Sequence, residues 1–186
     1  MTRSEGMITM RPASWPDGRA GLAQLIRDIE LGEMSMIEVG SYRGESAEIF
    51  MDSGKVSRMI CVDPWQAGYD DADKASFSDM AKVEADFDAR MSKYGGRVRK
   101  FKGTLQQLFQ EGVPSADFVY VDSCHTYDGC KADVLTALAA KPAYIGGHDY
   151  NGGFQGVVDA VNETVGAPDK VYPDTSWIKK LGNGGA

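Results

Sequence analysis

The sequence predicts an α/β fold built on a doubly wound, mostly parallel sheet of seven strands. Short apolar runs that are typical of buried strands alternate along the chain with segments whose apolar residues recur every three or four positions, the period of a helix. Glycines and polar residues follow several of these apolar runs directly. This alternation predicts a sheet with helices on both faces. At 186 residues, the chain is expected to form a single domain over residues 1–186.

The pattern places each element in turn. Strands are predicted at residues 36–39, 58–62, 98–102, 116–121, 142–145, 171–173 and 177–181. Helices are predicted at residues 17–31 and 45–51, within 65–96, at 105–109, from 127 to about 140, and at 157–165. Residues 1–16 show no periodicity, and we expect an irregular lead-in there.

Composition narrows the function classes. The chain carries 20 basic and 27 acidic residues, a net charge of −7, which disfavours binding to a nucleic-acid backbone. No apolar run approaches the length of a membrane span, and the N-terminus lacks the apolar segment of a signal peptide. Three cysteines without a Cys-x-x-Cys pair fit reduced thiols. We therefore expect a cytoplasmic protein without nucleic-acid or membrane partners.

The stretch Met36-Ile-Glu-Val-Gly-Ser-Tyr-Arg-Gly44 is the first candidate for a ligand site. It combines a buried strand, an acidic residue and two glycines with a following helix, an arrangement that directs backbone N–H groups at a ligand. Gly40 permits a turn without a side chain, and Gly44 lets the helix begin close to the strand. An ordinary turn in any α/β protein would show the same two glycines, so other parts of the chain must decide between a ligand site and an ordinary turn.

Asp63 ends the second predicted strand, 25 residues after Glu38. A carboxylate about 20 residues beyond a glycine turn can accept hydrogen bonds from both hydroxyls of a ribose. The alternative is a turn-forming residue before Pro64. Spacing and chemistry together favour the ribose role.

Polar side chains also follow the later strands, and the carboxyl ends of parallel strands meet at one edge of the sheet. Both histidines of the chain lie in these turns, each near an aspartate, which is hard to explain by packing alone. The residues expected at this edge are Glu38, Asp63, Thr104, Asp122, His125, His148 and Asp149.

Two of these turns carry a resemblance to a known family. The runs Asp122-Ser-Cys-His125-Thr-Tyr127 and Gly147-His148-Asp149-Tyr150, together with the acid-glycine turn, resemble small single-domain class I S-adenosylmethionine (SAM) dependent methyltransferases of the family 24 type, which are related to O-methyltransferases. The resemblance extends over roughly residues 22–181. It implies a Rossmann-like sheet in which the last two strands form an antiparallel edge.

The resemblance also implies roles for individual residues. The SAM-binding residues would be Glu38, Gly40, Ser41, Gly44, Asp63, Thr104 and Asp122, with Asp63 on the ribose and Thr104 at the adenine edge. Related enzymes bind a divalent cation after strands four and five, and the corresponding residues here are Asp122, His148 and Asp149. His148 departs from the usual Asp-Asp or Asp-Asn pair. An imidazole ligand would shift the preference from Mg²⁺ toward Mn²⁺, iron or Zn²⁺.

We therefore predict methyl transfer from SAM to a hydroxyl of a small molecule, such as a sugar or a phenol. His125 is the candidate general base beside Asp122, because histidine titrates near neutrality. The alternative for His125 is a hydrogen bond to the turn after the fifth strand. Residues 66–73 are rich in glycine and aspartate and are either a lid over the site or a solvated acidic loop. A partner subunit, as in a homodimer, would also be able to close the site.

Two other functions remain open. A non-catalytic SAM-binding or regulatory module would share the cofactor residues, although the histidine pair argues for catalysis. A nicotinamide-dependent oxidoreductase is disfavoured, because Tyr42 stands where the second glycine of Gly-x-Gly-x-x-Gly lets the pyrophosphate approach. A nucleic-acid methyltransferase lacks the Asn-Pro-Pro-Tyr type motif after the fourth strand.

Overall fold

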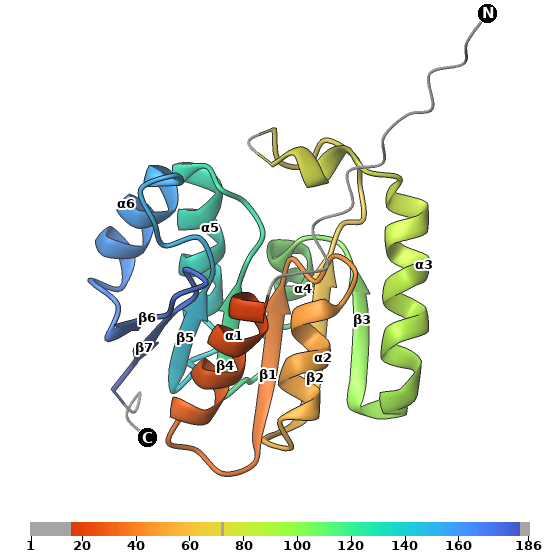
Figure 1. Cartoon of the computed structure of the whole chain (residues 1–186), viewed down its shortest axis with the longest axis horizontal. Helices are drawn as coiled ribbons and strands as arrows, with labels where there is room; N and C mark the ends of the chain where they lie inside the picture. The colour runs from red at the N-terminus through yellow and green to blue at the C-terminus, as the bar shows by residue number, and fades with distance from the viewer. Residues whose placement is uncertain (1–15, 72, 183–186) are drawn as a thin grey trace, which may run out of the picture.

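A seven-stranded sheet forms the centre of the molecule in the computed structural model, which describes residues 16–71 and 73–182 (Figure 1). Its strand order is β3-β2-β1-β4-β5-β7-β6. The strands are β1 (Met34–Val39), β2 (Val56–Asp63), β3 (Val98–Lys102), β4 (Phe118–Val121), β5 (Tyr144–Gly147), β6 (Lys170–Val171) and β7 (Trp177–Lys180). Strands β1 to β5 are parallel, and β7 runs antiparallel to both β5 and β6. The predicted Rossmann-like sheet and its antiparallel edge are confirmed.

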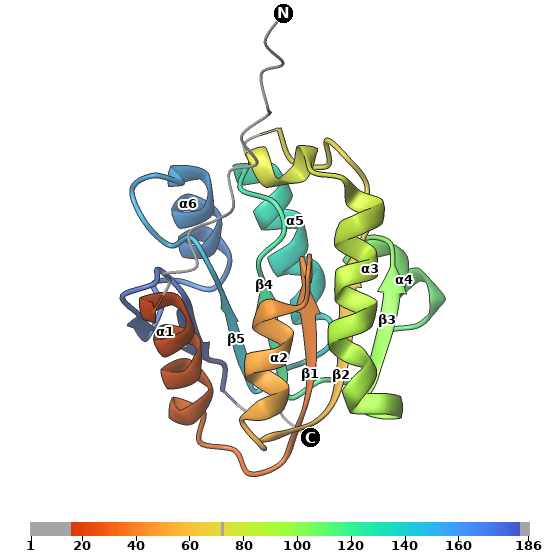
Figure 2. The same ribbon diagram turned by 45° about the vertical axis from the view of Figure 1, so that its right-hand side comes forward.

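Helices cover both faces of the sheet (Figure 2). One face carries α1 (Pro16–Asp28), α2 (Glu45–Asp52) and α3 (Met80–Met91), and the other carries α4 (Leu105–Glu111), α5 (Tyr127–Leu138) and α6 (Gln155–Thr164). Two short 3-10 helices, η1 (Lys74–Phe77) and η2 (Ser92–Arg97), flank α3. No helix in the described part of the chain is both long and apolar enough to span a membrane. The lead-in predicted at residues 1–16 lies outside the described residues up to residue 15.

Burial on both faces explains why the strands appear in the sequence as continuous apolar runs. Met34 and Met36 of β1 pack under α1 and α2, whereas Ile37 and Val39 pack under the helices of the opposite face. All four residues of β4 are buried. The central strands β1 and β4 are neighbours, although they are not consecutive in the chain. The order of strands therefore reverses between them, which is where open α/β sheets bind ligands.

The fifth strand lies two residues later than the sequence suggested, at 144–147 instead of 142–145. Gly146 and Gly147 were expected in the following turn but belong to the strand. A Cβ atom on Gly146 would lie 2.6 Å from the carbonyl oxygen of Trp177, and one on Gly147 would lie 2.8 Å from the Trp177 indole nitrogen. A Cβ atom on Gly147 would lie nearer still to the carbonyl oxygen of Val121, so close packing against the β7 tryptophan and the end of β4 accounts for the two glycines.

Helix α1 ends at Asp28, three residues before the predicted end. The ammonium group of Lys55 donates hydrogen bonds to the carbonyl oxygens of Ile26, Arg27 and Ile29, at 3.2, 3.3 and 2.5 Å. A lysine that directly precedes β2 thus satisfies carbonyl groups in the last turn of the helix and just beyond it.

Candidate functional site

The glycine turn after β1 touches the turn after β4. Gly40 and Gly44 have φ angles of 88° and 76°, in the left-handed region that favours glycine. A Cβ atom on Gly40 would lie 1.8 Å from the carbonyl oxygen of Asp122. Glycine is therefore required at this position, and the predicted cofactor turn lies directly beside the predicted catalytic turn.

Below this turn lies a buried carboxylate. Glu38 is fully buried in β1, and its Oε1 atom accepts a hydrogen bond of 2.6 Å from the hydroxyl of Ser46. Its Oε2 atom and the buried Ser41 hydroxyl make no hydrogen bond of ordinary geometry with any described residue, although Ser41 lies close enough to oppose the rise in the pKa of Glu38. Burial raises the pKa of Glu38 to about 7. Two polar groups at the predicted methionine end of the cofactor site are therefore buried without a hydrogen bond of ordinary geometry in the described chain.

Asp63 organises the cofactor turn through its carboxylate. Its Oδ2 atom accepts a hydrogen bond of 2.8 Å from the backbone N–H of Tyr42, and its Oδ1 atom accepts one of 2.6 Å from that of Trp65. The indole N–H of Trp65 in turn donates to the carbonyl oxygen of Tyr42 at 2.9 Å. Burial raises the pKa of Asp63. Each carboxylate oxygen can accept more than one hydrogen bond, so these contacts leave capacity for ribose hydroxyls.

Thr104 lies at the end of β3 but is occupied by helix capping. Its hydroxyl accepts a hydrogen bond from the backbone N–H of Gln107 at 3.2 Å, and its own N–H donates to the side chain of Gln107 at 2.8 Å. This reciprocal pair is a capping box for α4. The predicted contact of Thr104 with adenine stays a prediction.

Asp122, His148 and Asp149 converge at the carboxyl ends of β4 and β5, as predicted. One possible ligand atom from each lies within 4.8 Å of the others. The Nδ1 atom of His148 lies 3.2 Å from a carboxylate oxygen of Asp149, which adopts a φ angle of 60°. Burial alone would lower the pKa of His148, but the hydrogen bond with Asp149 and the charge of Asp122 raise it to about 9. Two carboxylates and one imidazole form a donor set of the kind that holds a divalent cation.

His125 bridges two carboxylates. Its Nε2 atom lies 2.8 Å from Asp149 and its Nδ1 atom 2.6 Å from Asp70, and the ring packs on Phe154 with centroids 4.5 Å apart. Burial alone would lower the pKa of His125, but hydrogen bonds with Asp149 and Asp70 raise it to about 9. Burial opposes the ionisation of Asp149, yet the two histidines hold its pKa below its usual value. His125 makes the contact with the β5 turn that was the alternative to general-base catalysis.

Asp70 is the site residue that the sequence analysis missed. It lies in the connection between β2 and α3, which crosses the carboxyl ends of the strands (Figure 1). Asp70 is 3% exposed, so the interpretation of residues 66–73 as a solvated acidic loop is wrong for this residue. The surplus of acidic residues in this loop was the only signal in the sequence, and it did not single out Asp70.

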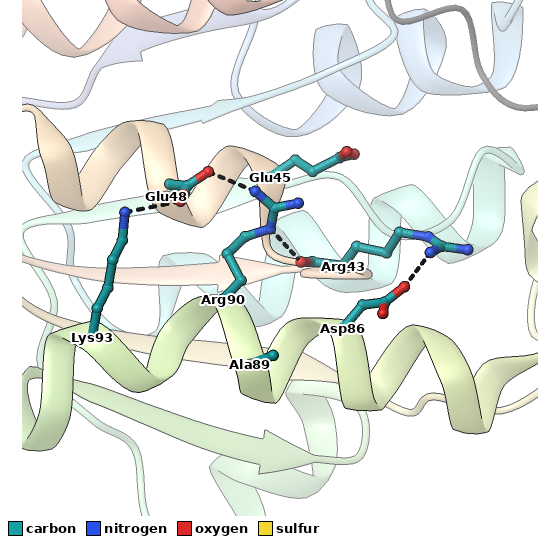
Figure 3. A pocket seen from close by; sticks show the side chains of 7 residues that line it. All are labelled: Arg43, Glu45, Glu48, Asp86, Ala89, Arg90 and Lys93. Atoms are coloured by element: carbon teal, nitrogen blue, oxygen red, sulfur yellow. Dashed lines mark hydrogen bonds and ion pairs between the residues drawn. The ribbon is translucent and has the colours of Figure 1, made fainter.

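The hollow between α2 and α3 is a separate feature (Figure 3). The side chain of Arg90 donates to the carbonyl oxygen of Arg43 at 3.0 Å and to Glu48 at 2.6 Å, and Lys93 contacts Glu48 at 2.9 Å. Arg43 pairs with Asp86. These contacts fasten α3 to the turn at Arg43. Arg43 belongs to the turn after β1, but none of the predicted site residues lines this hollow, so the ligand site lies elsewhere.

Comparison with solved structures supports the architecture. An O-methyltransferase from Bacillus cereus in complex with S-adenosylhomocysteine (SAH) is 17% identical, with a TM-score of 0.57 over 87% of this chain and 78% of that chain. An SAH-bound methyltransferase from Podospora anserina is 16% identical, with a TM-score of 0.58 over 88% and 77%. A ribosomal protein L11 methylase from Lactobacillus delbrueckii subsp. bulgaricus is 13% identical, with a TM-score of 0.56 over 86% and 76%. At these identities, the likeness shows the fold alone.

Sequence comparison gives the family. No curated protein matches the chain. A family model described as a methyltransferase domain matches residues 37–150, which include the cofactor turn, Asp63 and the turns after β4 and β5. The match covers more than half of the chain, and the sheet is that of the class I enzymes. The chain therefore belongs to this methyltransferase family, within the class I SAM-dependent methyltransferases.

Proposed function

We propose that this protein transfers a methyl group from SAM to a hydroxyl group of a small molecule. One observation carries the proposal: the cofactor turn at Gly40 lies against Asp122, and Asp122 belongs to a cluster of carboxylates and histidines at the same edge of the sheet. This arrangement brings a predicted methyl donor beside groups suited to hold and deprotonate an acceptor.

The described residues fit the cofactor. Glu38 Oε2 and Ser41 Oγ are buried polar atoms without a hydrogen bond of ordinary geometry among the described residues, and the bare backbone at Gly40 keeps side chains out of the turn. Buried polar groups in native structures normally have partners, so two such atoms beside a glycine turn suggest a polar ligand. SAM carries positive charge on its sulfonium and ammonium groups, which suits an edge that also presents Asp63 and Asp122. SAM would supply the electrophilic methyl group.

The donor set at Asp122, His148 and Asp149 fits a divalent cation. We favour Mn²⁺, iron or Zn²⁺ over Mg²⁺, because imidazole suits these metals better. A cation held there would polarise the acceptor hydroxyl and lower its pKa. Asp122 would thus face both the metal and the methionine end of SAM. While Nε2 of His125 carries its proton, its hydrogen bond to Asp149 would keep the carboxylate of Asp149 in a fixed orientation.

His125 is the proposed acceptor of the hydroxyl proton. An alcohol is a weak nucleophile while it retains its proton, so a base at this edge would speed transfer. The raised pKa means that His125 is protonated at neutral pH in the arrangement described, and it accepts a proton only after releasing its own. Nδ1 is held by Asp70, so the proton would leave from Nε2 to solvent, which breaks the hydrogen bond with Asp149 and frees Nε2 to accept the proton of the hydroxyl.

The fold does not select the acceptor, because a ribosomal protein methylase shares it. The direct test is a methylation assay with labelled SAM on a panel of phenols and monosaccharides, with and without a chelator. We expect product with at least one class of hydroxyl acceptor, and loss of turnover on chelation that Mn²⁺ restores. If the protein copurifies without metal and chelation does not change its turnover, the proposed metal site is contradicted. SAM binding without transfer to any acceptor would favour the regulatory-module alternative.

Asp63 should anchor the cofactor. We expect Asp63→Ala to weaken SAH binding by about 10- to 100-fold, because a hydrogen bond to a charged acceptor contributes about 1.5–3 kcal/mol. Isothermal titration calorimetry with SAH gives the affinity. Since Asp63 also holds the backbone of Tyr42 and Trp65, thermal unfolding of the free variant must be measured as a control. An unchanged affinity would remove Asp63 from the cofactor site.

A further inference from the structure

Asp70 contacts His125 twice with one oxygen atom. Its Oδ2 atom accepts a hydrogen bond of 2.8 Å from the backbone N–H of His125 and lies 2.6 Å from Nδ1 of the same residue. The two residues are 55 positions apart in the sequence and come from different turns at the same edge of the sheet. Because Asp70 binds both the backbone N–H and the ring of His125, the imidazole side chain is restricted in its rotation.

We propose that Asp70 is the positioning residue of His125, and that it fixes both the orientation and the tautomer of the imidazole ring. The hydrogen bond with Asp70 raises the pKa of His125, as an accepting carboxylate does, so the Nδ1 atom that faces Asp70 carries a proton. Nε2 also faces a carboxylate, that of Asp149 at 2.8 Å, but Asp70 holds Nδ1 together with the backbone N–H of the same residue, which leaves Nε2 as the ring nitrogen for proton exchange. Phe154 packs on the ring and opposes its tilting.

The catalytic meaning of this contact rests on the proposed function, whereas its effect on the orientation of the His125 ring does not. The segment that carries Asp70 is tied to the cofactor turn by separate contacts, from the indole of Trp65 to the carbonyl of Tyr42 and between the hydroxyls of Tyr42 and Ser78, 3.1 Å apart. Asp70 itself contacts the catalytic side. Removing its carboxylate should therefore disturb His125 and leave cofactor binding in place.

The test compares Asp70→Ala and Asp70→Asn with Asp71→Asn, a matched control at the exposed neighbouring carboxylate. The chain has two histidines, so imidazole signals in ¹H–¹⁵N spectra are few, and a His125→Gln variant assigns the ring of interest. We expect a strongly deshielded Nδ1 proton in the wild type and in Asp71→Asn. The Nδ1 proton signal should disappear in Asp70→Ala and shift in Asp70→Asn. Because asparagine keeps the shape of the side chain, Asp70→Asn still provides the measurement if Asp70→Ala does not fold.

Turnover provides the second readout, with the phenol or monosaccharide that the wild type methylates. We expect Asp70→Ala to lower kcat by about 10- to 100-fold, the usual cost of losing such a supporting partner, and to change the KM for SAM less than twofold. Asp71→Asn should retain both values. An equal loss of SAM affinity would indicate general disruption of the site and overturn the positioning role.

The two readouts separate the two proposals. If no acceptor is methylated, the proposed function fails, while the imidazole spectra still decide whether Asp70 fixes the ring. If the Nδ1 signal of His125 is the same in the wild type and both Asp70 variants, the positioning role is overturned even when methylation is found. Loss of the signal together with a selective fall in kcat supports both.

Discussion

Replacing His125 with glutamine is expected to lower kcat by about 10²- to 10⁴-fold, the usual contribution of a general base. Glutamine can form hydrogen bonds with Asp70 and Asp149 but cannot take up a proton. In the wild type, the rate should rise with pH, because His125 must lose its proton before it can act and its hydrogen bonds with Asp149 and Asp70 raise its pKa. This pH dependence should be absent from the variant.

The measurement is a pH profile of kcat for the wild type, His125→Gln and Cys124→Ser. Cys124 is the adjacent residue in the same turn, and its thiol contacts the Thr126 hydroxyl at 3.2 Å. Because the thiol has no role in the proposed chemistry, we expect Cys124→Ser to preserve both the rate and its pH profile. If His125→Gln keeps the wild-type pH dependence with a small fall in rate, His125 only orients Asp149, and the proton goes elsewhere.

The second large effect concerns stability. Glu38 has its pKa raised from a usual value near 4.5 to about 7 by burial. Between these values the unfolded chain loses the proton of Glu38 while the folded protein retains it, so stability falls as pH rises. This difference corresponds to roughly 3 kcal/mol of unfolding free energy. The contribution is fully present below pH 4.5 and is lost as pH rises through about 7, so the wild type should lose this stability between about pH 4.5 and 7, and Glu38→Gln should not.

Urea unfolding of the cofactor-free protein at several pH values measures this effect. The quantity to compare is the difference in unfolding free energy between the wild type and Glu38→Gln, because other titrating groups then cancel. Glu45→Gln is the matched control, since Glu45 is exposed at the start of the helix that follows. Parallel curves for the wild type and Glu38→Gln would contradict a protonated, buried Glu38. The same variant should bind SAH more weakly, which would show that a destabilising residue is retained for cofactor binding.

Much of the fold and part of the site could be predicted from local sequence. Strand β3 was placed at its observed bounds, and Asp122, His148 and Asp149 were expected together, because turns after parallel strands meet at one edge. What was missed depends on distant contacts. The end of α1 is held by Lys55, which directly precedes β2, and the glycines of β5 depend on Trp177 from β7 and on the end of β4.

Asp70 illustrates the same limit at the site itself. Its loop contains several aspartates, and the sequence gives no reason to prefer one of them. Only the folded chain shows that the carboxylate of Asp70, and not that of the exposed Asp71, reaches His125. Hydrogen bonds between turns far apart in sequence have no local periodicity, so they cannot be predicted from a single sequence.

Calorimetric titration of the purified protein with SAH and, separately, with NADH tests the central claim most directly. The claim is that the turn from Glu38 to Gly44 binds the methyl donor of a methyltransferase. We expect saturable binding of one SAH per chain and no measurable binding of NADH, because Tyr42 occupies the position where a dinucleotide site needs glycine. Tight binding of NADH without binding of SAH would contradict the account.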